Sequence, residues 1–197
     1  MDSQSFQQHL LDTFNFLQQE DLDLLWPFCQ VHVLKAKQEL RKADDPANEI
    51  YFIRTGSVRG YLQLPSGEER TLFIRGQGKF FGPPEVLSAE AKSALIVETI
   101  QASEVLVVNF PGFEQLTHNN LALSRLFIEA LRENTLALVF RVKMLAGKSP
   151  GERYDILMAE YPELFEEAQH QYIANYLGIT PNSLSRIIRR RAGKDRS

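Results

Sequence analysis

Apolar and polar positions follow two different periods along the chain. Residues 6–28 place large apolar side chains near helical spacing and predict short helices that pack against the next part of the chain. In residues 31–108, short runs rich in Val, Ile, Phe and Tyr are separated by clusters of Gly, Pro, Asn and Asp. Many short strands with closely spaced turns predict a sandwich, barrel or jelly roll, with a hairpin turn at residues 64–68.

A long helical pattern without Pro or Gly runs from about residue 120 to residue 145. A helix of about 25 residues is longer than a small β domain needs for cover, since each residue adds about 1.5 Å. Its apolar stripe therefore predicts a contact with the same helix of a second subunit, the alternative being one helix that covers the β domain. The predicted dimer interface comprises Leu123, Leu126, Phe127, Ala130, Leu131, Leu138 and Val142.

Residues 171–191 contain two short helical patterns that meet at Gly178. Gly178 can take a positive φ, Thr180 can cap a helix, and Pro181 suits a first helical position. The second pattern has apolar residues on one face and polar and basic residues on the other. Two such helices joined by a tight turn predict a helix-turn-helix that can enter a DNA major groove.

The polar face of the second helix supplies the candidate DNA contacts. Arg186 is the best candidate for a guanine edge because its guanidinium can donate two parallel hydrogen bonds. Arg189 and Arg190 are assigned to the DNA backbone, and a solvated helix face is the alternative for all three. The predicted DNA-binding residues are Thr180, Asn182, Ser183, Ser185, Arg186, Arg189 and Arg190.

Charge is distributed unevenly, although the 197 residues carry a formal net charge of only −3. An acidic segment precedes a basic end, and phosphate binding responds to such a local basic surface rather than to the average. The acidic residues are Glu152, Asp155, Glu160, Glu163, Glu166 and Glu167, and the basic ones are Arg186, Arg189, Arg190, Arg191, Lys194 and Arg196.

The single cysteine, Cys29, excludes an internal disulfide framework and indicates a reducing compartment. It is interpreted as a small buried hydrophobe, with redox sensing as the alternative. We find no leader with a cleavage site and no apolar run of membrane length, so we expect a cytoplasmic protein without a membrane partner. Four scattered histidines lack metal-ligand spacing and no enzyme motif occurs, so we expect neither a metal nor catalysis.

Several short segments occur in a characteristic order: Asp44-Asp45-Pro46-Ala47, Gly56-Ser57-Val58-Arg59, residues 76–82 and Ala102-Ser103-Glu104-Val105. Together with a β-rich region, a long helix, a linker at residues 147–151 and a helix-turn-helix, this order resembles the Crp/Fnr family of bacterial regulators. The resemblance implies an α+β fold with an N-terminal cyclic-nucleotide-binding-like jelly roll, a long dimerisation helix and a C-terminal helix-turn-helix domain. The implied units are 1–119, 120–146 and 147–197.

The family resemblance also implies an anion site in the β domain, formed by a Gly-Glu pair after a Phe-Gly turn and by an Arg-Ser/Thr-Ala trio. The matching residues here are Phe81, Gly82, Glu85, Lys92, Ser93 and Ala94. Pro83 and Pro84 remove two amide donors, and Lys92 lacks the planar fork of an arginine. These departures disfavour a standard cyclic nucleotide and leave open another anion or small molecule, or no ligand.

We therefore expect a homodimeric DNA-binding transcription regulator under effector control, whose implied partners are double-stranded DNA, a second copy and RNA polymerase. Because only six residues come after Arg191, the helix-turn-helix is expected to lack a full wing. A ligand-binding or protein-interaction module that has lost DNA binding is the second hypothesis. An enzyme that uses the β cavity is the third, and it lacks a candidate residue pair.

Overall fold

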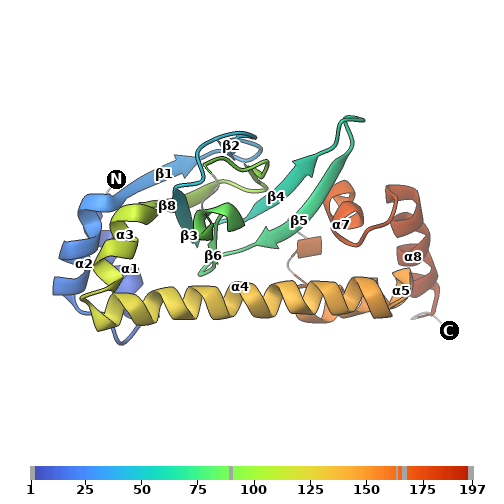
Figure 1. Ribbon diagram of the computed structural model, residues 1–197. Helices are drawn as coiled ribbons and strands as arrows, with labels where there is room; N and C mark the ends of the chain where they lie inside the picture. The colour runs from blue at the N-terminus through green and yellow to red at the C-terminus, as the bar shows by residue number, and fades with distance from the viewer. Residues whose placement is uncertain (1–2, 89–90, 163, 166–167, 195–197) are drawn as a thin grey trace.

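The computed structural model describes residues 3–88, 91–162, 164–165 and 168–194. Figure 1 shows the N-terminal helices at one end of an elongated molecule, a β region in the middle and the C-terminal helices at the other end. One long helix, α4, runs beneath all three along the length of the molecule. This mixed architecture confirms the predicted α+β class.

The described strands and helices occur in the order that the periodicities predict. The strands are β1 (Cys29–Leu34), β2 (Glu39–Arg41), β3 (Glu49–Thr55), β4 (Val58–Gln63), β5 (Glu69–Arg75), β6 (Phe80–Phe81), β7 (Ile96–Thr99) and β8 (Ser103–Asn109). The α-helices are α1 (Ser3–Thr13), α2 (Gln19–Leu25), α3 (Phe110–Thr117), α4 (Leu121–Gly147), α5 (Pro150–Glu160), α7 (His170–Tyr176) and α8 (Pro181–Lys194). Two short 3₁₀ helices, η1 (Trp26–Phe28) and η2 (Pro84–Leu87), complete the described elements.

The strands form two four-stranded antiparallel sheets with the orders β1-β8-β3-β6 and β2-β7-β4-β5. The chain passes repeatedly between the two sheets, which is the arrangement of a jelly roll. The predicted hairpin turn joins β4 to β5, where the Leu64 amide donates to the Glu68 carbonyl at 2.8 Å. The predicted β class of this region and the predicted hairpin turn at residues 64–68 are thus both confirmed.

Gly56 makes the tight turn between β3 and β4 possible. Its φ is 86°, in the left-handed region that side chains disfavour. A Cβ at this position would lie 2.3 Å from Ser103 Oγ and 2.4 Å from the Ala102 carbonyl oxygen. The backbone of the turn therefore packs directly against the start of β8.

The interior of the roll is filled by aromatic and branched side chains. Tyr51 and Phe81 are stacked with their ring centroids 4.9 Å apart, and Phe73 packs against Phe81 at 5.8 Å. Apolar residues of both sheets complete this cluster: Leu34, Ile53, Val58, Leu95, Val97, Val105 and Val107. These side chains form the hydrophobic core between the two sheets.

A second core joins the N-terminal helices to the roll and to the start of α4. Phe6 and Leu22 are among its fully buried members, together with Phe52 of β3 and Leu123 of α4. This arrangement explains the apolar spacing of residues 6–28, because those helices cover one end of the roll. The prediction that they pack against the next part of the chain is confirmed.

A third core spans the linker. It contains Ile74 and Ile100 from the roll, Met144 from α4, and Tyr154 and Leu157 from α5. The remaining members come from the C-terminal part of the chain: Leu164, Ala168, Tyr172, Ile173, Ala174, Tyr176, Leu177 and Leu184. The C-terminal helices are therefore packed on the roll and on α4 through a shared apolar core.

Helix α4 begins where Asn120 Oδ1 accepts a hydrogen bond from the Leu123 amide at 2.9 Å. Its 27 residues span about 40 Å. Within the described residues, neither α4 nor any other helix has the continuous apolar length that crossing a lipid bilayer requires. The helix is thus about as long as the sequence predicts.

The apolar residues of α4 lie on two faces, and this corrects the predicted dimer interface. Leu123, Leu126 and Ala130 are 0%, 3% and 7% exposed, because they pack inside this chain's own core. Phe127 also packs internally, with its ring centroid 5.5 Å from that of Phe110. These four side chains already have partners within the chain, so we remove them from the dimer surface.

The other predicted interface residues point outward. Leu131, Leu138 and Val142 are 36%, 61% and 56% exposed. Other large apolar residues of α4 are exposed as well, namely Leu121, Ile128, Leu136, Val139 and Leu145. The helix therefore carries one apolar face that covers the roll and one that the described part of the chain leaves exposed.

Candidate nucleic-acid interface

Helices α7 and α8 form a helix-turn-helix at the end of the molecule shown in red in Figure 1. In the turn, Gly178 has a φ of 67°, the left-handed value predicted for it. Thr180 Oγ1 accepts a hydrogen bond from the Ser183 amide at 3.2 Å and so caps the start of α8. The local signals around Gly178 therefore produce the predicted turn.

The angle between the two helices is fixed by four side chains with no exposed surface. Leu184 of α8 belongs to the same apolar core as Ile173 and Ala174 of α7 and Leu177 at the C-cap of α7. Each of the four is 0% exposed. The methyl group of Ala174 leaves room for the second helix to approach closely. The opposite face of α8 is thereby directed outward.

The outward face of α8 carries the predicted DNA-binding residues. Thr180, Asn182, Arg186, Arg189 and Arg190 are exposed. The two serines, Ser183 and Ser185, are partly buried, and Ser185 Oγ donates to the Pro181 carbonyl at 3.1 Å.

These exposed arginines keep their charge available. Arg186 donates to Ser183 Oγ at 3.2 Å. Within the described part of the chain, Arg186, Arg189 and Arg190 form no ion pair with a carboxylate. Three guanidinium groups on one helix face can therefore meet phosphates or base edges without first breaking an ion pair.

Arg191 has a different role from its neighbours. Its Nε donates to Asp155 Oδ1 of α5 at 2.8 Å, and its Nη2 pairs with the other oxygen of the same carboxylate. Part of the predicted basic end therefore binds α8 to α5. Four of the other predicted charges, Glu163, Glu166, Glu167 and Arg196, lie outside the described residues. The segment 195–197, on which the wing prediction depends, lies outside them as well.

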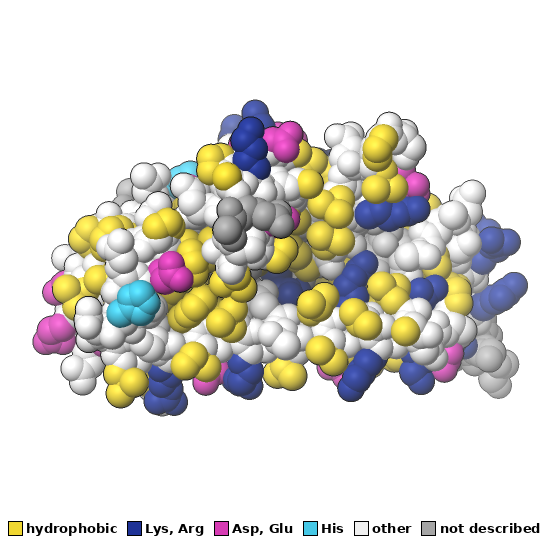
Figure 2. Space-filling view, in the orientation of Figure 1, with side chains coloured by type: hydrophobic (Ala, Val, Ile, Leu, Met, Phe, Trp, Pro, Cys, Tyr) yellow, Lys and Arg dark blue, Asp and Glu magenta, His cyan; other side chains and the backbone are white. Residues whose placement is uncertain are grey.

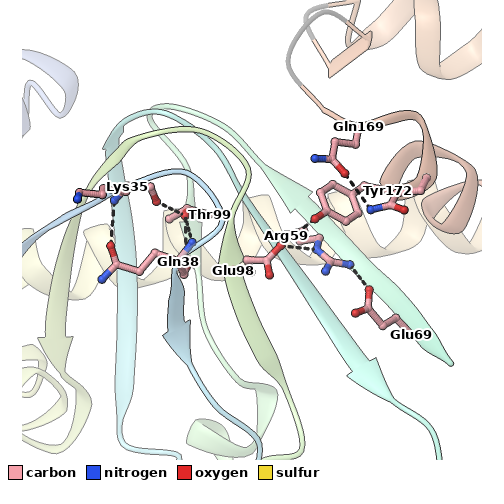
Figure 3. Close-up of polar contacts among 9 residues, drawn as sticks. Lys35, Gln38, Arg59, Glu69, Glu98, Thr99, Gln169 and Tyr172 are labelled. Carbon is pink, nitrogen blue, oxygen red and sulfur yellow. Dashed lines mark hydrogen bonds and ion pairs between the residues drawn. The ribbon is translucent and has the colours of Figure 1, made fainter. Parts of the chain in front are cut away.

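The helix-turn-helix is seated on the outer side of β4, β5 and β7 through a buried arginine. Arg59 of β4 is 3% exposed, and its Nη1 lies 2.6 Å from Glu69 Oε2 while its Nε lies 3.2 Å from Glu98 Oε1. Tyr172 of α7 closes this site from above, as Figure 3 shows, by donating its hydroxyl to the same Glu98 oxygen at 3.1 Å. Helix α7 therefore contacts the same carboxylate that pairs with Arg59 of the sheet.

Arg59 is also stacked between two rings. Its guanidinium carbon lies 4.1 Å from the centroid of Tyr61 and 3.9 Å from that of Tyr172. Burial acts to lower the pKa of Arg59, but the hydrogen bond and charge of Glu69, with the charge of Glu98, outweigh it and raise the pKa. The guanidinium is therefore charged at any physiological pH and holds both carboxylates.

Backbone contacts add a second attachment between α7 and β5. Asn175 Oδ1 accepts a hydrogen bond from the Thr71 amide at 2.6 Å, and its Nδ2 donates to the Glu69 carbonyl at 2.5 Å. Arg141 of α4 donates to the Tyr176 carbonyl at 2.8 Å and to the Thr71 carbonyl at 2.7 Å. Three parts of the chain, α4, β5 and α7, are therefore joined at one point.

Sequence reasoning did not find these seating contacts. Its only signal was an arginine within the largely apolar strand β4, a residue type that is rarely buried unless paired. The partners of that arginine come from β5, β7 and α7, and no spacing in the sequence links them. The fold alone brings them together.

The predicted ligand residues lie apart from the two cavities described for this chain. Phe81 is 3% exposed and stacked on Tyr51, and Ser93 is 2% exposed with its Oγ accepting from the Leu95 amide at 3.1 Å. Lys92 is exposed, whereas Gly82 and Glu85 lie at or beside η2. Neither of the two cavities described for this chain is lined by any of the six predicted residues, Ala94 included.

A buried arginine braces the loop next to this predicted site. Arg41 is 2% exposed and donates to the carbonyl groups of Asp45 and Pro46 at 2.6 and 2.8 Å. Pro46 forms an isolated bridge with Lys92. The loop geometry is thus maintained by contacts within the chain.

Cys29 has an environment typical of a structural thiol. It is partly buried, and its Sγ donates to the Leu25 carbonyl at 3.4 Å. Burial raises the pKa of this thiol to about 12, so the thiolate is scarce at neutral pH. Among the described residues, no group of three or more His, Cys, Asp or Glu side chains is arranged to hold a metal ion.

Comparison with known proteins finds a similar domain and several similar regulators. Residues 31–120 match the model of the cyclic nucleotide-binding domain. The cAMP-activated global transcriptional regulator CRP of Haemophilus influenzae is 28% identical over 99 residues, which are 50% of this chain and 44% of that protein. The cyclic AMP receptor protein of Thermus thermophilus is 24% identical over 183 residues, 89% of this chain and 82% of that protein. The chain therefore contains a region similar to the cyclic nucleotide-binding domain, and proteins similar to it include transcriptional regulators.

The structural comparison shows a fold shared with a solved structure. The structure of FixK2 from Bradyrhizobium japonicum superposes with a TM-score of 0.72 at 19% identity, covering 85% of this chain and 86% of that one. Three of the curated relatives are matched over only 44%, 66% and 61% of their own length. The fold is therefore shared, while the activities of the relatives do not transfer by similarity alone.

Replacing Asn175 by Ala is expected to loosen the seat of the helix-turn-helix. The change removes the partner of the Thr71 amide and of the Glu69 carbonyl, and a buried group left unpaired costs about 1–3 kcal/mol. Hydrogen exchange of the Thr71 amide, measured by NMR, should accelerate by roughly tenfold or more. Asn182→Ala is the control, because Asn182 is exposed on α8; unchanged Thr71 exchange in Asn175→Ala would contradict the described seat.

Proposed function

We propose that this chain is a DNA-binding transcription regulator that acts as a homodimer and reads a two-fold symmetric site. The observation that carries the proposal is the outward face of α8, where Arg186, Arg189 and Arg190 are exposed beside a capped helix start and free of ion pairs among the described residues. A helix with this face, supported from behind by a second helix, matches the geometry that enters a major groove.

The residues of α8 divide into two roles in this proposal. Arg186 lies on the second turn of the helix, where side chains reach base edges, and its planar fork suits a guanine. Asn182, Ser183 and Ser185 contact bases or phosphates near the start of the helix, with Thr180 beside them. Arg189 and Arg190 lie further along and bind the DNA backbone, which fixes the register without reading sequence.

The exposed apolar face of α4 supports a dimer. Ile128, Leu131, Leu138, Val142 and Leu145 are all exposed. With Thr135 between them, their spacing alternates three and four residues, which is the a/d pattern of a two-stranded coiled coil. The same helix from a second copy would cover this face and place two α8 helices about 34 Å apart, one DNA turn.

Effector control is the third part of the proposal. The roll is the sensor, and α4 and β5 both contact α7, so a change in the sensor can alter the placement of α8. Two of the relatives described above carry cyclic AMP in their names, but Pro83 and Pro84 remove amide donors and Lys92 lacks the planar fork of an arginine at the implied anion site. We therefore propose an effector other than a standard cyclic nucleotide, and RNA polymerase is the partner that the family implies.

Selection of bound duplexes from random DNA at low salt tests the function directly. We expect enrichment of an inverted repeat whose half-sites lie about 10 base pairs apart, and an affinity that falls steeply as salt rises. Arg186→Ala should relax the preference at one position of each half-site at a cost of about 1–3 kcal/mol. Arg189→Ala should weaken all sequences alike and reduce the salt slope by about 1.

The outcome separates the competing hypotheses. No enriched motif from a folded wild-type protein would favour a module that has lost DNA binding. Equal losses for Arg186→Ala and Arg189→Ala across a panel of sites would contradict the division of roles. Arg191→Ala serves as a further comparison, because its contact with Asp155 predicts reduced stability rather than altered sequence preference.

Leu138→Asp tests the proposed dimer. Leu138 is 61% exposed at the centre of the apolar face, so a charge there should not disturb the core but should be buried in the dimer. Sedimentation should find a wild-type dimer and a monomeric variant at the same micromolar concentration. Leu24→Asp is the matched control, because Leu24 is 51% exposed on α2; a wild-type monomer, or a dimeric Leu138→Asp variant, would contradict the proposal.

A further inference from the structure

A cavity of about 670 Å³ lies where the roll, α4 and the C-terminal helices meet. The roll contributes the end of β5 and the turn before β6, including Arg75 and Lys79. Helix α4 contributes Arg132 and Phe140, and the C-terminal part contributes Tyr161 and Tyr176. Figure 2 shows the hollow between the β region and the long helix, with basic side chains in its wall. This volume falls within the usual range of small-molecule sites.

Two of the three basic side chains in the wall are neutralised within the chain. Lys79 Nζ lies 3.0 Å from Glu133 Oε1, and Arg132 Nε donates to Glu129 Oε2 at 3.0 Å. Both pairs are formed with carboxylates of α4 itself. These two residues therefore shape the rim of the cavity but offer little free charge.

Arg75 differs from the other two. Its Nη1 donates to the Ile74 carbonyl at 3.1 Å, and its Nη2 lies 3.5 Å from Asn134 Oδ1. Its guanidinium carbon lies 5.3 Å from the ring centroid of Phe73. Among the described residues it has no ion pair with a carboxylate. A largely desolvated cation thus lines the cavity with only weak neutral partners.

The electrostatics of Arg75 agree with this geometry. Burial lowers its pKa, and the surrounding Tyr176, Glu133 and Tyr161 only partly offset that effect. A buried charge without a paired counter-charge costs free energy, which a bound anion would recover. The site is therefore favourable for a negative group next to Arg75.

The rest of the lining includes Gln77, Gln101 and Glu133, and it also has an apolar and aromatic part. Phe140, Tyr161 and Tyr176 line it together with Leu136 and Leu157. Contact between these side chains and an apolar or aromatic group of a ligand would bury apolar surface and favour binding. The same side chains would not stabilise a small hydrated ion such as phosphate. The cavity therefore suits a molecule that combines one anionic group with an apolar body.

We propose that this cavity binds a small amphipathic organic anion, whose carboxylate or sulfonate pairs with the Arg75 guanidinium while its apolar body packs against Phe140, Tyr161 and Tyr176. The site is distinct from the anion site that the family resemblance implies, because none of the six residues of that site lines it. An occupant touches the sensor, α4 and the C-terminal helices at once. Its effect on DNA binding rests on the proposed function, whereas its binding does not.

Two fluorescent probes test the site in the full-length protein. One is 8-anilinonaphthalene-1-sulfonate, and the other is N-phenyl-1-naphthylamine, which has the same rings without the sulfonate. We expect the wild type to bind both probes. Arg75→Gln should weaken the sulfonate probe by roughly tenfold or more, since a hydrogen bond to a charged group is worth that much, and should leave the neutral probe within about twofold.

Two further variants keep the test decisive. Ala137→Phe fills the cavity from α4 and should abolish the binding of both probes, while Arg70→Gln removes the same charge from the other cavity and should change neither. Circular dichroism and thermal unfolding confirm that each variant is folded. The proposal is overturned if the folded wild type binds no sulfonate probe, if Arg75→Gln affects both probes equally, or if Arg70→Gln has the larger effect. Loss of DNA binding would not alter these results, because neither probe needs DNA.

Discussion

A buried guanidinium sets the position of the helix-turn-helix in this molecule. Arg59 is almost completely shielded from water, so its charge must be met by other charges and by aromatic faces. Glu69 and Glu98 provide the charges from the neighbouring strands, and Tyr61 provides one ring from the sheet itself. The second ring, that of Tyr172, belongs to α7, so the surroundings of Arg59 are complete only when the helix-turn-helix is seated on the sheet.

The rest of the architecture is arranged around that seat. Helix α4 covers the roll with one face and reaches α7 through Arg141, which bonds to backbone carbonyl groups on both sides of the junction. The third core, which joins Ile74 and Ile100 to the C-terminal helices, fills the space beneath. A displacement of the strands of the roll therefore moves groups that contact α7 directly, and the cavity beside Arg75 opens onto the same junction.

Local signals in the sequence predicted much of the fold but little of this junction. The alternation of strands and turns, the length of α4 and the turn at Gly178 are short-range features, and each was found where the residues indicated. The apolar stripe of α4 was interpreted as one face, whereas Leu123 and Leu126 cover the roll and Leu138 points outward. Spacing shows that a helix is apolar on a side, but only the fold shows which neighbour covers that side.

Some residues of the candidate sites could likewise be predicted from the sequence, and others could not. The exposed arginines of α8 were predicted because they share one helix face, which the sequence displays directly. The partners of Arg59 and the isolation of Arg75 were not, because both depend on strands and helices that are distant along the chain. The predicted ligand residues were assigned by resemblance, and here Phe81 and Ser93 are used for packing and for a backbone contact.

The most direct test of the central claim is a double-mutant cycle between Arg59 and Tyr172. The free energies of unfolding of the wild type, Arg59→Gln, Tyr172→Ala and the double variant can be measured in urea by circular dichroism at a fixed protein concentration. If the seat of α7 depends on this contact, the two changes should be coupled by about 1 kcal/mol or more. Additive effects, within about 0.3–0.5 kcal/mol, would show that the helix-turn-helix does not depend on Arg59 for its position.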